Sequence, residues 1–401
     1  MQHGKIGFLD KYIFNKTALK VFFAVLFVAI LVIVIALGRN ERKYIGIAEG
    51  GITADATRGT EPAVTETGDT TAADTTVVTE TEPPEPKVEI VLDGGHTFDV
   101  LMQYMRQTEN IGLLKSAGTL LTLDEYLALC KEVEGVTVVT KIDLGGAVVD
   151  LAQGESDISG HTVEDKAKFD AMLAHAPGGI KLVMCDCGYT DDEMGALREK
   201  YPDIDFAWRI YMGQWSLRTD DEAFSVMIRD DSHVRLENED IEVLRYCTNL
   251  YALDLGHQAL TDLTVVGELT DLRVLILADN LFSDITPLSN LKNLQYLELF
   301  VSKVEDLTPI AACTELVDLN FGWTRVSDLT PIYSLEKLER LWLPHTRVPY
   351  AVRGEIEEKF PEATIIFEDK DSVSSGWRTH ERYFTMRGMF NNNKYNPDFV
   401  K

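Results

Sequence analysis

Residues that could carry chemistry are plentiful in this chain, but their spacing matches no catalytic motif. The 401 residues include 8 histidines, 5 cysteines and 65 Asp or Glu residues. They form no Gly-x-Ser-x-Gly elbow, no His-Glu-x-x-His zinc motif, no phosphate-binding loop and no Gly-x-Gly-x-x-Gly motif. We therefore expect no cofactor and no enzymatic activity.

Two local clusters remain as candidates for a site. Asp93-Gly94-Gly95-His96 has the side chains of a metal or acid site, but Asp-Gly-Gly after an apolar run is more often a turn. Cys185 and Cys187 alternate along an expected strand and so face one side, either as a core pair or as half of a metal site. No second Cys/His pair stands at zinc spacing, which favours the core pair.

The elements that must position any functional residue are set by a repeat. Leu250, Leu272, Leu294, Leu316 and Leu338 lie 22 residues apart, and each begins a Leu-x-x-Leu-x-Leu pattern in which Phe may take the last place. Alternation of the last two apolar positions predicts a short strand with one buried face. No single turn can bury its own leucines, so the turns must stack into a parallel sheet with a shared core.

A second signature follows the strands. Residues 284–288, 306–310 and 328–332 each read Asp, an aliphatic residue, Thr, Pro and a second aliphatic residue. Proline suits the first turn of a short helix or 3₁₀ segment, and the preceding Thr is expected to cap it. Together the two signatures predict an α/β solenoid, with a parallel sheet on the concave face and helices or 3₁₀ segments on the convex face.

Two further cysteines fit this repeat. Cys247 and Cys313 occupy the same apolar column as Leu269, Leu291 and Leu335. They are three turns apart, about 14 Å at the spacing of neighbouring strands, which is too far for a disulfide. We expect both to be buried small hydrophobic residues.

The five turns resemble the 22-residue leucine-rich repeats of internalin-type bacterial surface proteins. The resemblance covers about residues 250–349 and implies a curved solenoid that binds ligands on its concave sheet. The asparagine usual after the strand is kept only at Asn280, with Gln258, Ser302, Thr324 and Thr346 elsewhere in that column, so fewer side-chain hydrogen bonds are expected at the bends. The chain as a whole resembles membrane-anchored leucine-rich-repeat proteins of clostridia-like bacteria.

The concave face is where a ligand-binding site is expected. Because the leucines point inward, the third, fifth, seventh and eighth positions of each pattern point to that face. Aromatic and charged side chains gather there in the C-terminal half, and exposed aromatic clusters mark binding surfaces. The predicted site comprises Tyr296, Glu298, Phe300, Asp318, Trp323, Arg340, Trp342 and His345. The alternatives are a chance exposure of aromatic residues and a patch covered by the C-terminal tail.

The regular repeats, residues 250–349, are flanked by less regular segments. Residues 88–134 are expected to cap the N-terminal end, with a helix over 123–133, and residues 135–249 to form longer, irregular repeats. Their expected strands are 136–144, 181–187, 206–211 and 224–228, and their expected helices lie around 162–175 and 190–201. Residues 350–401 should contain a helix at 355–360, a strand at 364–367 and an aromatic, basic tail that caps the solenoid end or docks a partner.

The N-terminal region predicts a membrane anchor. Val21–Leu37 is an uninterrupted apolar run of about 26 Å as a helix, so residues 1–20 are expected to be cytoplasmic and 21–38 to span the cell membrane once. A cleaved signal peptide is the alternative, because Ala36-Leu37-Gly38 resembles a cleavage site. Residues 39–87 are rich in Thr, Glu and Pro and predict a disordered stalk that displays an extracytoplasmic domain.

Charge narrows the choice of partner. The formal net charge of −27 argues against nucleic acid and anionic lipid surfaces as ligands of the displayed domain. We therefore expect a binding protein that recognises a protein, peptide or glycan of the cell envelope. The alternatives are an envelope hydrolase with an unrecognised site within residues 88–230, and a sensor that signals through a partner protein.

Overall fold

The computed structural model describes residues 87–226, 234–369 and 376–400. All of these residues belong to one compact unit, which is described by itself. No helix in the described ranges is long and apolar enough to cross a bilayer. The predicted span Val21–Leu37 and the stalk up to residue 86 lie outside those ranges, so both remain predictions.

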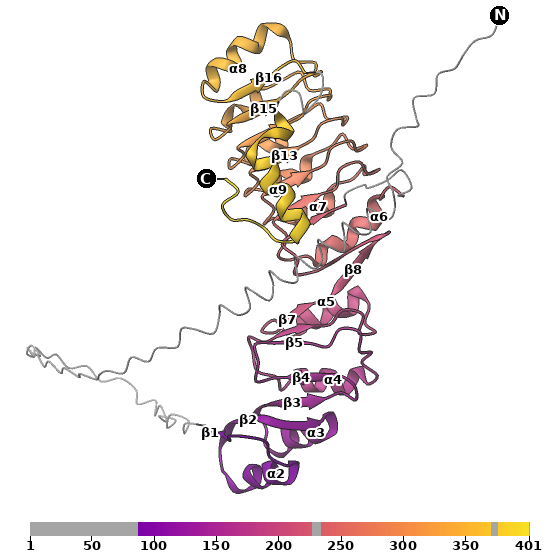
Figure 1. The fold of residues 1–401 in the computed structure, drawn as a ribbon, viewed down its shortest axis with the longest axis vertical. Coiled ribbons are helices and arrows are strands. Elements are labelled where there is room, and N and C mark those ends of the chain that lie inside the picture. The colour runs from indigo at the N-terminus through magenta and orange to yellow at the C-terminus, as the bar shows by residue number, and fades with distance from the viewer. Residues whose placement is uncertain (1–86, 227–233, 370–375, 401) are drawn as a thin grey trace, which may run out of the picture. The chain divides into compact units, whose positions relative to one another are not determined.

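Seven parallel strands form the largest sheet, in chain order (Figure 1). The register joins Leu253, Leu275, Leu297, Leu319 and Leu341 in one row. All the pattern leucines of the five turns, and Phe321 in the fourth, are at most 6% exposed, which confirms the stacking inferred from the repeat. The strands are β10 (Ala223–Ser225), β11 (Ala252–Asp254), β12 (Val274–Ile276), β13 (Tyr296–Glu298), β14 (Asp318–Asn320), β15 (Arg340–Trp342) and β16 (Thr364–Ile366).

Short helical segments return the chain from one strand to the next, as the Thr-Pro signature predicts. The expected cap is wrong in its detail, because Asp rather than Thr supplies the capping oxygen. The carboxylate of Asp306 accepts a hydrogen bond from the Thr308 backbone N–H at 2.8 Å, and Asp284 and Asp328 do the same in their turns. The segments are α7 (Thr264–Glu268), η2 (Thr286–Asn290), η3 (Thr308–Ala312), η4 (Thr330–Ser334), η5 (Tyr350–Val352) and α8 (Arg353–Lys359).

The bends after the strands have uneven hydrogen bonding, as their sequences lead one to expect. The Asn280 side chain accepts from the Leu260 N–H and donates to the carbonyls of Leu255 and Leu277. Thr324, by contrast, makes one bond, to the Phe321 carbonyl at 2.7 Å. The buried Ser302 hydroxyl has no hydrogen-bond partner among the described residues.

The N-terminal part of the unit is a four-stranded sheet in the order β1-β2-β3-β4. Its pairs are parallel except β3 with β4. The helix expected over 123–133 is present as α3, and a capping box between Thr122 and Glu125 begins it. The elements are β1 (Val88–Val91), α2 (Phe98–Gln107), β2 (Ile111–Thr122), α3 (Leu123–Glu132), β3 (Thr137–Asp143) and β4 (Val148–Asp150).

The middle part holds a three-stranded parallel sheet and a hairpin. The expected strand 206–211 is two strands, since β7 ends at Ala207 and β8 begins at Arg209 and turns back at Gly213 into β9. The expected strand 181–187 ends at Val183, and Asp186 beyond it takes a φ of +58°, which is not a strand conformation. The elements are β5 (Glu155–Asp157), α4 (Lys166–Leu173), β6 (Lys181–Val183), α5 (Asp191–Lys200), β7 (Asp205–Ala207), β8 (Arg209–Met212), β9 (Trp215–Arg218), α6 (Asn238–Ile241) and η1 (Glu242–Tyr246).

The C-terminal segment, residues 376–400, packs across the concave face of the seven-stranded sheet. It contains η6 (Trp377–Thr379) and α9 (Glu381–Asn392), drawn in yellow over the strands in Figure 1. A second hydrophobic cluster joins this segment to side chains of β10 to β13 and of β15. The tail therefore covers the concave face rather than the end of the sheet, where β16 pairs with β15. The segment's residues in the cluster are Trp377, Met386, Met389, Phe390, Tyr395 and Phe399.

Candidate ligand-binding surface

The predicted site residues lie where strand geometry puts them. Tyr296, Asp318 and Arg340 are side-by-side partners in three neighbouring strands. Glu298, Asn320 and Trp342 form the adjacent row. Both rows face the side of the sheet opposite the leucine core, since Tyr296 and Trp342 belong to the second cluster and the leucines to the first.

Most of this predicted site is not accessible. Five of its eight members are at most 4% exposed because the C-terminal segment covers them. The expectation of an open aromatic patch on the concave face must therefore be corrected, and the alternative of a covering tail is the arrangement observed. Whether any of the eight residues binds a ligand stays a prediction. The five covered residues are Tyr296, Glu298, Asp318, Arg340 and Trp342.

Asp318 is the centre of a buried ionic cluster. Its Oδ1 accepts from Arg340 Nε at 2.8 Å and from Arg382 Nη1 at 2.7 Å, and its Oδ2 accepts from Arg340 Nη2. The side chains of Asp318, Arg340 and Arg382 are 1%, 5% and 13% exposed. One buried carboxylate thus holds an arginine of the sheet and an arginine of α9, and both contacts are charge-assisted.

Trp377 fills the space beside this cluster. Its ring centroid lies 5.4 Å from that of Tyr296 and 5.0 Å from that of Trp342, and the Arg340 guanidinium stacks over it at 4.5 Å. Its indole Nε1 donates to Oε1 of Glu298, which also accepts from the Tyr296 hydroxyl. Burial raises the pKa of Glu298, while the bonds from Tyr296 and Trp377 oppose that rise.

An open margin remains beside the covered rows. We use "exposed margin" for His257, Asp279, Val301, Trp323 and His345, which occupy one position of five successive turns with φ between 53° and 63°. Trp323 is 53% exposed and stacks on His345 with ring centroids 3.8 Å apart. Farther along, His257 Nδ1 lies 3.0 Å from the Asp279 carboxylate. Trp323 and His345 are the members of the predicted site that a partner can reach most directly.

The cysteines that the sequence offered as candidates are packed in hydrophobic clusters of buried residues. All five cysteines are buried and unbridged, and Cys247 and Cys313 lie in the main core as expected. Cys185 and Cys187 do not form a core pair, because Cys185 packs with Val183 and Ala207 while Cys187 joins the main core. In the described ranges, no group of three or more His, Cys, Asp or Glu side chains is placed to hold a metal ion.

The Asp93–His96 stretch forms a bend, as the turn interpretation predicts. The backbone of Gly94 and Gly95 packs so closely on Gly118 that a Cβ on Gly118 would come within 2.4 Å of Gly94. The His96 N–H donates to the Thr119 hydroxyl at 2.8 Å. These glycines therefore permit a close approach of two backbones.

Sequence reasoning offered a covering tail as an alternative but did not identify which residues of the C-terminal segment meet the concave side. Arg378, Arg382 and Arg387 bring positive charge to a face whose own strands carry Asp254, Glu298 and Asp318. The only signal in the sequence was the aromatic and basic composition of the tail in a chain of net charge −27. That signal indicates attraction to the rest of the chain but does not identify the residues that meet.

Comparison with known proteins agrees with the repeat analysis. A family model described as leucine-rich repeats (2 copies) matches residues 270–312. No curated protein matches the chain. Among solved structures, an internalin (inlF) of Listeria monocytogenes is 17% identical over 71% of this chain and 81% of its own, with a TM-score of 0.34.

Two further solved structures have similar values. Internalin C2 (inlC2) of Listeria monocytogenes is 19% identical over 55% of this chain and 85% of its own, with a TM-score of 0.30. A leucine-rich-repeat protein of Leptospira interrogans is 16% identical over 68% of this chain and 75% of its own, with a TM-score of 0.33. The family match and the seven-stranded sheet together establish that this chain contains leucine-rich repeats.

Proposed function

We propose that the chain is a binding protein, anchored in the cell membrane by Val21–Leu37, which recognises a protein, peptide or glycan of the cell envelope at its exposed margin. One observation carries the proposal: Trp323 is 53% exposed and stacks on His345 outside the covered part of the concave face. An exposed, stacked aromatic pair offers a large and rigid contact area, which is typical of residues that dominate binding energy.

The covered rows have a different role in this proposal. Tyr296, Asp318 and Arg340 hold the C-terminal segment in place, and the segment fixes the sheet that carries the margin. Side chains committed to an internal cluster are unavailable to a partner unless the segment is displaced. Recognition therefore falls to the open side chains, with Phe300 half-buried beside Val301.

The test compares capture of cell-envelope material by the full-length chain and by its Trp323→Ala variant. Trp323 is largely exposed, so its truncation should change the free energy of unfolding by no more than about 0.5–1 kcal/mol. We expect the variant to lose at least about 10-fold in affinity for the captured partner, the loss typical of a binding hot spot.

Tyr350→Ala is the matched control, since Tyr350 is an aromatic residue 80% exposed on η5, outside the margin. It should bind as the wild type does. Equal capture by the wild type and by Trp323→Ala would refute the assignment of the margin. Protease added to intact cells tests the anchor separately, because cleavage in the stalk should release the displayed domain.

A further inference from the structure

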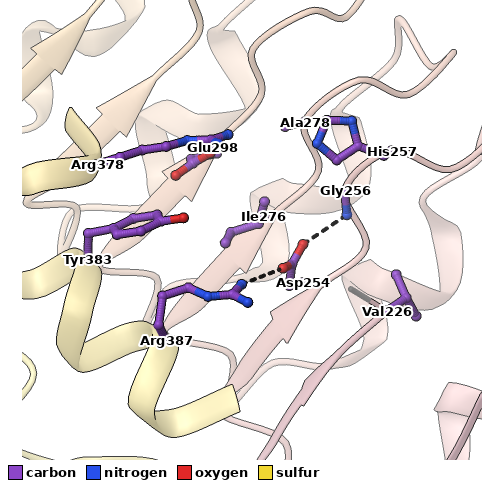
Figure 2. A pocket seen from close by; sticks show the side chains of 10 residues that line it. All are labelled: Val226, Asp254, Gly256, His257, Ile276, Ala278, Glu298, Arg378, Tyr383 and Arg387. Carbon is purple, nitrogen blue, oxygen red and sulfur yellow. Dashed lines mark hydrogen bonds and ion pairs between the residues drawn. The ribbon is translucent and has the colours of Figure 1, made fainter. Parts of the chain in front are cut away.

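A cavity of about 250 Å³ lies between the sheet and the C-terminal segment (Figure 2). Apolar side chains of Val226, Ile276 and Ala278 line part of it. In Figure 2 the side chains of Arg378, Tyr383 and Arg387 reach from the C-terminal segment toward those of the sheet. The sheet contributes Asp254, His257 and Glu298 to the opposite wall. The cavity therefore exists only while the segment is docked.

The acidic groups of the cavity already have donors. Asp254 Oδ1 accepts from the Gly256 N–H at 3.0 Å, and its Oδ2 accepts from the Ser225 hydroxyl at 2.8 Å. Arg387 Nη1 lies 3.6 Å from the same Oδ2. Glu298 Oε1 accepts from Trp377 and Tyr296. A cationic ligand would have to compete with these bonds.

Arg378, by contrast, has a donor that lacks an acceptor in the described part of the chain. Its Nε is buried and has no hydrogen-bond partner among the described residues. Its guanidinium lies 5.8 Å from the centre of the Phe300 ring, a contact that supplies no hydrogen-bond acceptor to this Nε. A buried donor without a partner is destabilising, so an acceptor in the cavity that reached this Nε would remove that cost.

From this unpartnered donor we propose that the cavity binds a small monocarboxylate with an apolar body. A carboxylate matches the planar guanidinium of Arg378 through two parallel hydrogen bonds, and the Tyr383 hydroxyl and Arg387 are on the same wall. The apolar lining receives the rest of the ligand. The volume is below the range of about 300–1,000 Å³ typical of drug-sized ligands, so the ligand must be small.

Phosphate is a poorer fit than a carboxylate. A dianion would face the carboxylates of Asp254 and Glu298 in a chain of net charge −27, and the resulting repulsion grows with the ligand's charge. Phosphate would also leave the apolar lining without a contact. The site is separate from the exposed margin except for His257, and its test does not depend on the proposed function.

Isothermal titration of the full-length chain tests the proposal with 4-methylpentanoate, its neutral amide and inorganic phosphate as probes. We expect the carboxylate to bind and the amide to bind at least about 10-fold more weakly, because charge-assisted hydrogen bonds are lost. Arg378→Gln should weaken carboxylate binding by a similar factor. Arg347→Gln is the control, since Arg347 is 63% exposed and pairs with Glu305 outside the cavity.

Three results would overturn the inference. They are equal binding of the amide and the carboxylate, tighter binding of phosphate than of the carboxylate, and unchanged carboxylate affinity in Arg378→Gln. The comparison of carboxylate and amide uses the wild-type chain alone, so it decides the matter even if Arg378→Gln fails to fold.

Discussion

The indole Nε1 of Trp377 donates a hydrogen bond to Oε1 of Glu298 over 2.7 Å, although the two residues are 79 positions apart in the sequence. Trp377 is 0% exposed and Glu298 is 2% exposed. The bond joins the C-terminal segment to β13 at the middle of the concave face. It satisfies a polar group on each side that burial would otherwise leave without water, so both partners depend on the docked segment.

Replacing Trp377 separates packing from this hydrogen bond. Trp377→Phe keeps an aromatic ring but removes the donor, and we expect a loss of about 1–3 kcal/mol in the free energy of unfolding. Trp377→Ala also empties the space beside Tyr296 and Trp342 and should cost about 3–5 kcal/mol. Urea-induced unfolding measures both. Phe384→Ala, on the exposed side of α9, should stay within about 0.5 kcal/mol of the wild type. A Trp377→Phe variant as stable as the wild type would contradict this account.

Removing the charge of Asp318 should lower the free energy of unfolding more than removing an exposed charge does. Asp318→Asn leaves Arg340 and Arg382 buried without a full countercharge, and breaking such a pair typically costs about 3–5 kcal/mol. Glu315→Gln breaks the exposed pair with Lys337 and should cost no more than about 1 kcal/mol. Both variants replace a carboxylate with an amide, and they differ mainly in how deeply the replaced side chain is buried. Faster tryptic cleavage within residues 376–400 of Asp318→Asn would show that the segment has been loosened. If both variants unfold at the same urea concentration, the cluster does not hold the segment.

The regular repeats could be predicted from the sequence because their information is local and periodic. The spacing of Leu275, Leu297 and Leu319 alone predicts one buried row, and the structure pairs them across neighbouring strands. The Thr-Pro segments were also predictable, since proline restricts the backbone whatever its surroundings. The capping residue was not, because Asp306 and Thr308 are both good cap formers and only the backbone path selects one.

The sequence predicted which face of the sheet carries the candidate site residues, but it did not predict whether those residues are accessible. Strand alternation correctly puts Tyr296 and Trp342 on the concave face, but no periodicity links them to Trp377. Contacts between segments that are distant in the sequence depend on the path by which the chain comes back to the sheet. A single sequence shows no periodic pattern for that path. The β8–β9 hairpin was missed for a related reason, since residues 206–211 resemble one strand and no strand was expected beyond the turn at Gly213.

The pH dependence of stability tests the state of Glu298. Burial raises the pKa of this carboxyl above its ordinary value, so the folded chain binds its proton more tightly than the unfolded chain does. The stabilisation is then present at low pH and is lost as the pH rises through the folded-state pKa. Relative to Glu298→Gln, which has no ionisable group there, the wild type should gain stability as the pH falls from 7.5 toward the ordinary value of 4.5.

Asp306 provides the control of opposite sign for this measurement. Hydrogen bonds from Thr308 lower the pKa of Asp306, so its contribution is present above its ordinary pKa of 3.8 and is lost only as the pH falls through the lower folded-state value. The difference between the wild type and Asp306→Asn should therefore stay level from pH 7.5 to 4.5, and decline only in more acidic solution. Urea titrations at four pH values across this interval measure both differences. A level difference between the wild type and Glu298→Gln would mean that Glu298 binds its proton equally in the folded and unfolded chains, and the pH sensitivity assigned to the burial of Glu298 would be wrong.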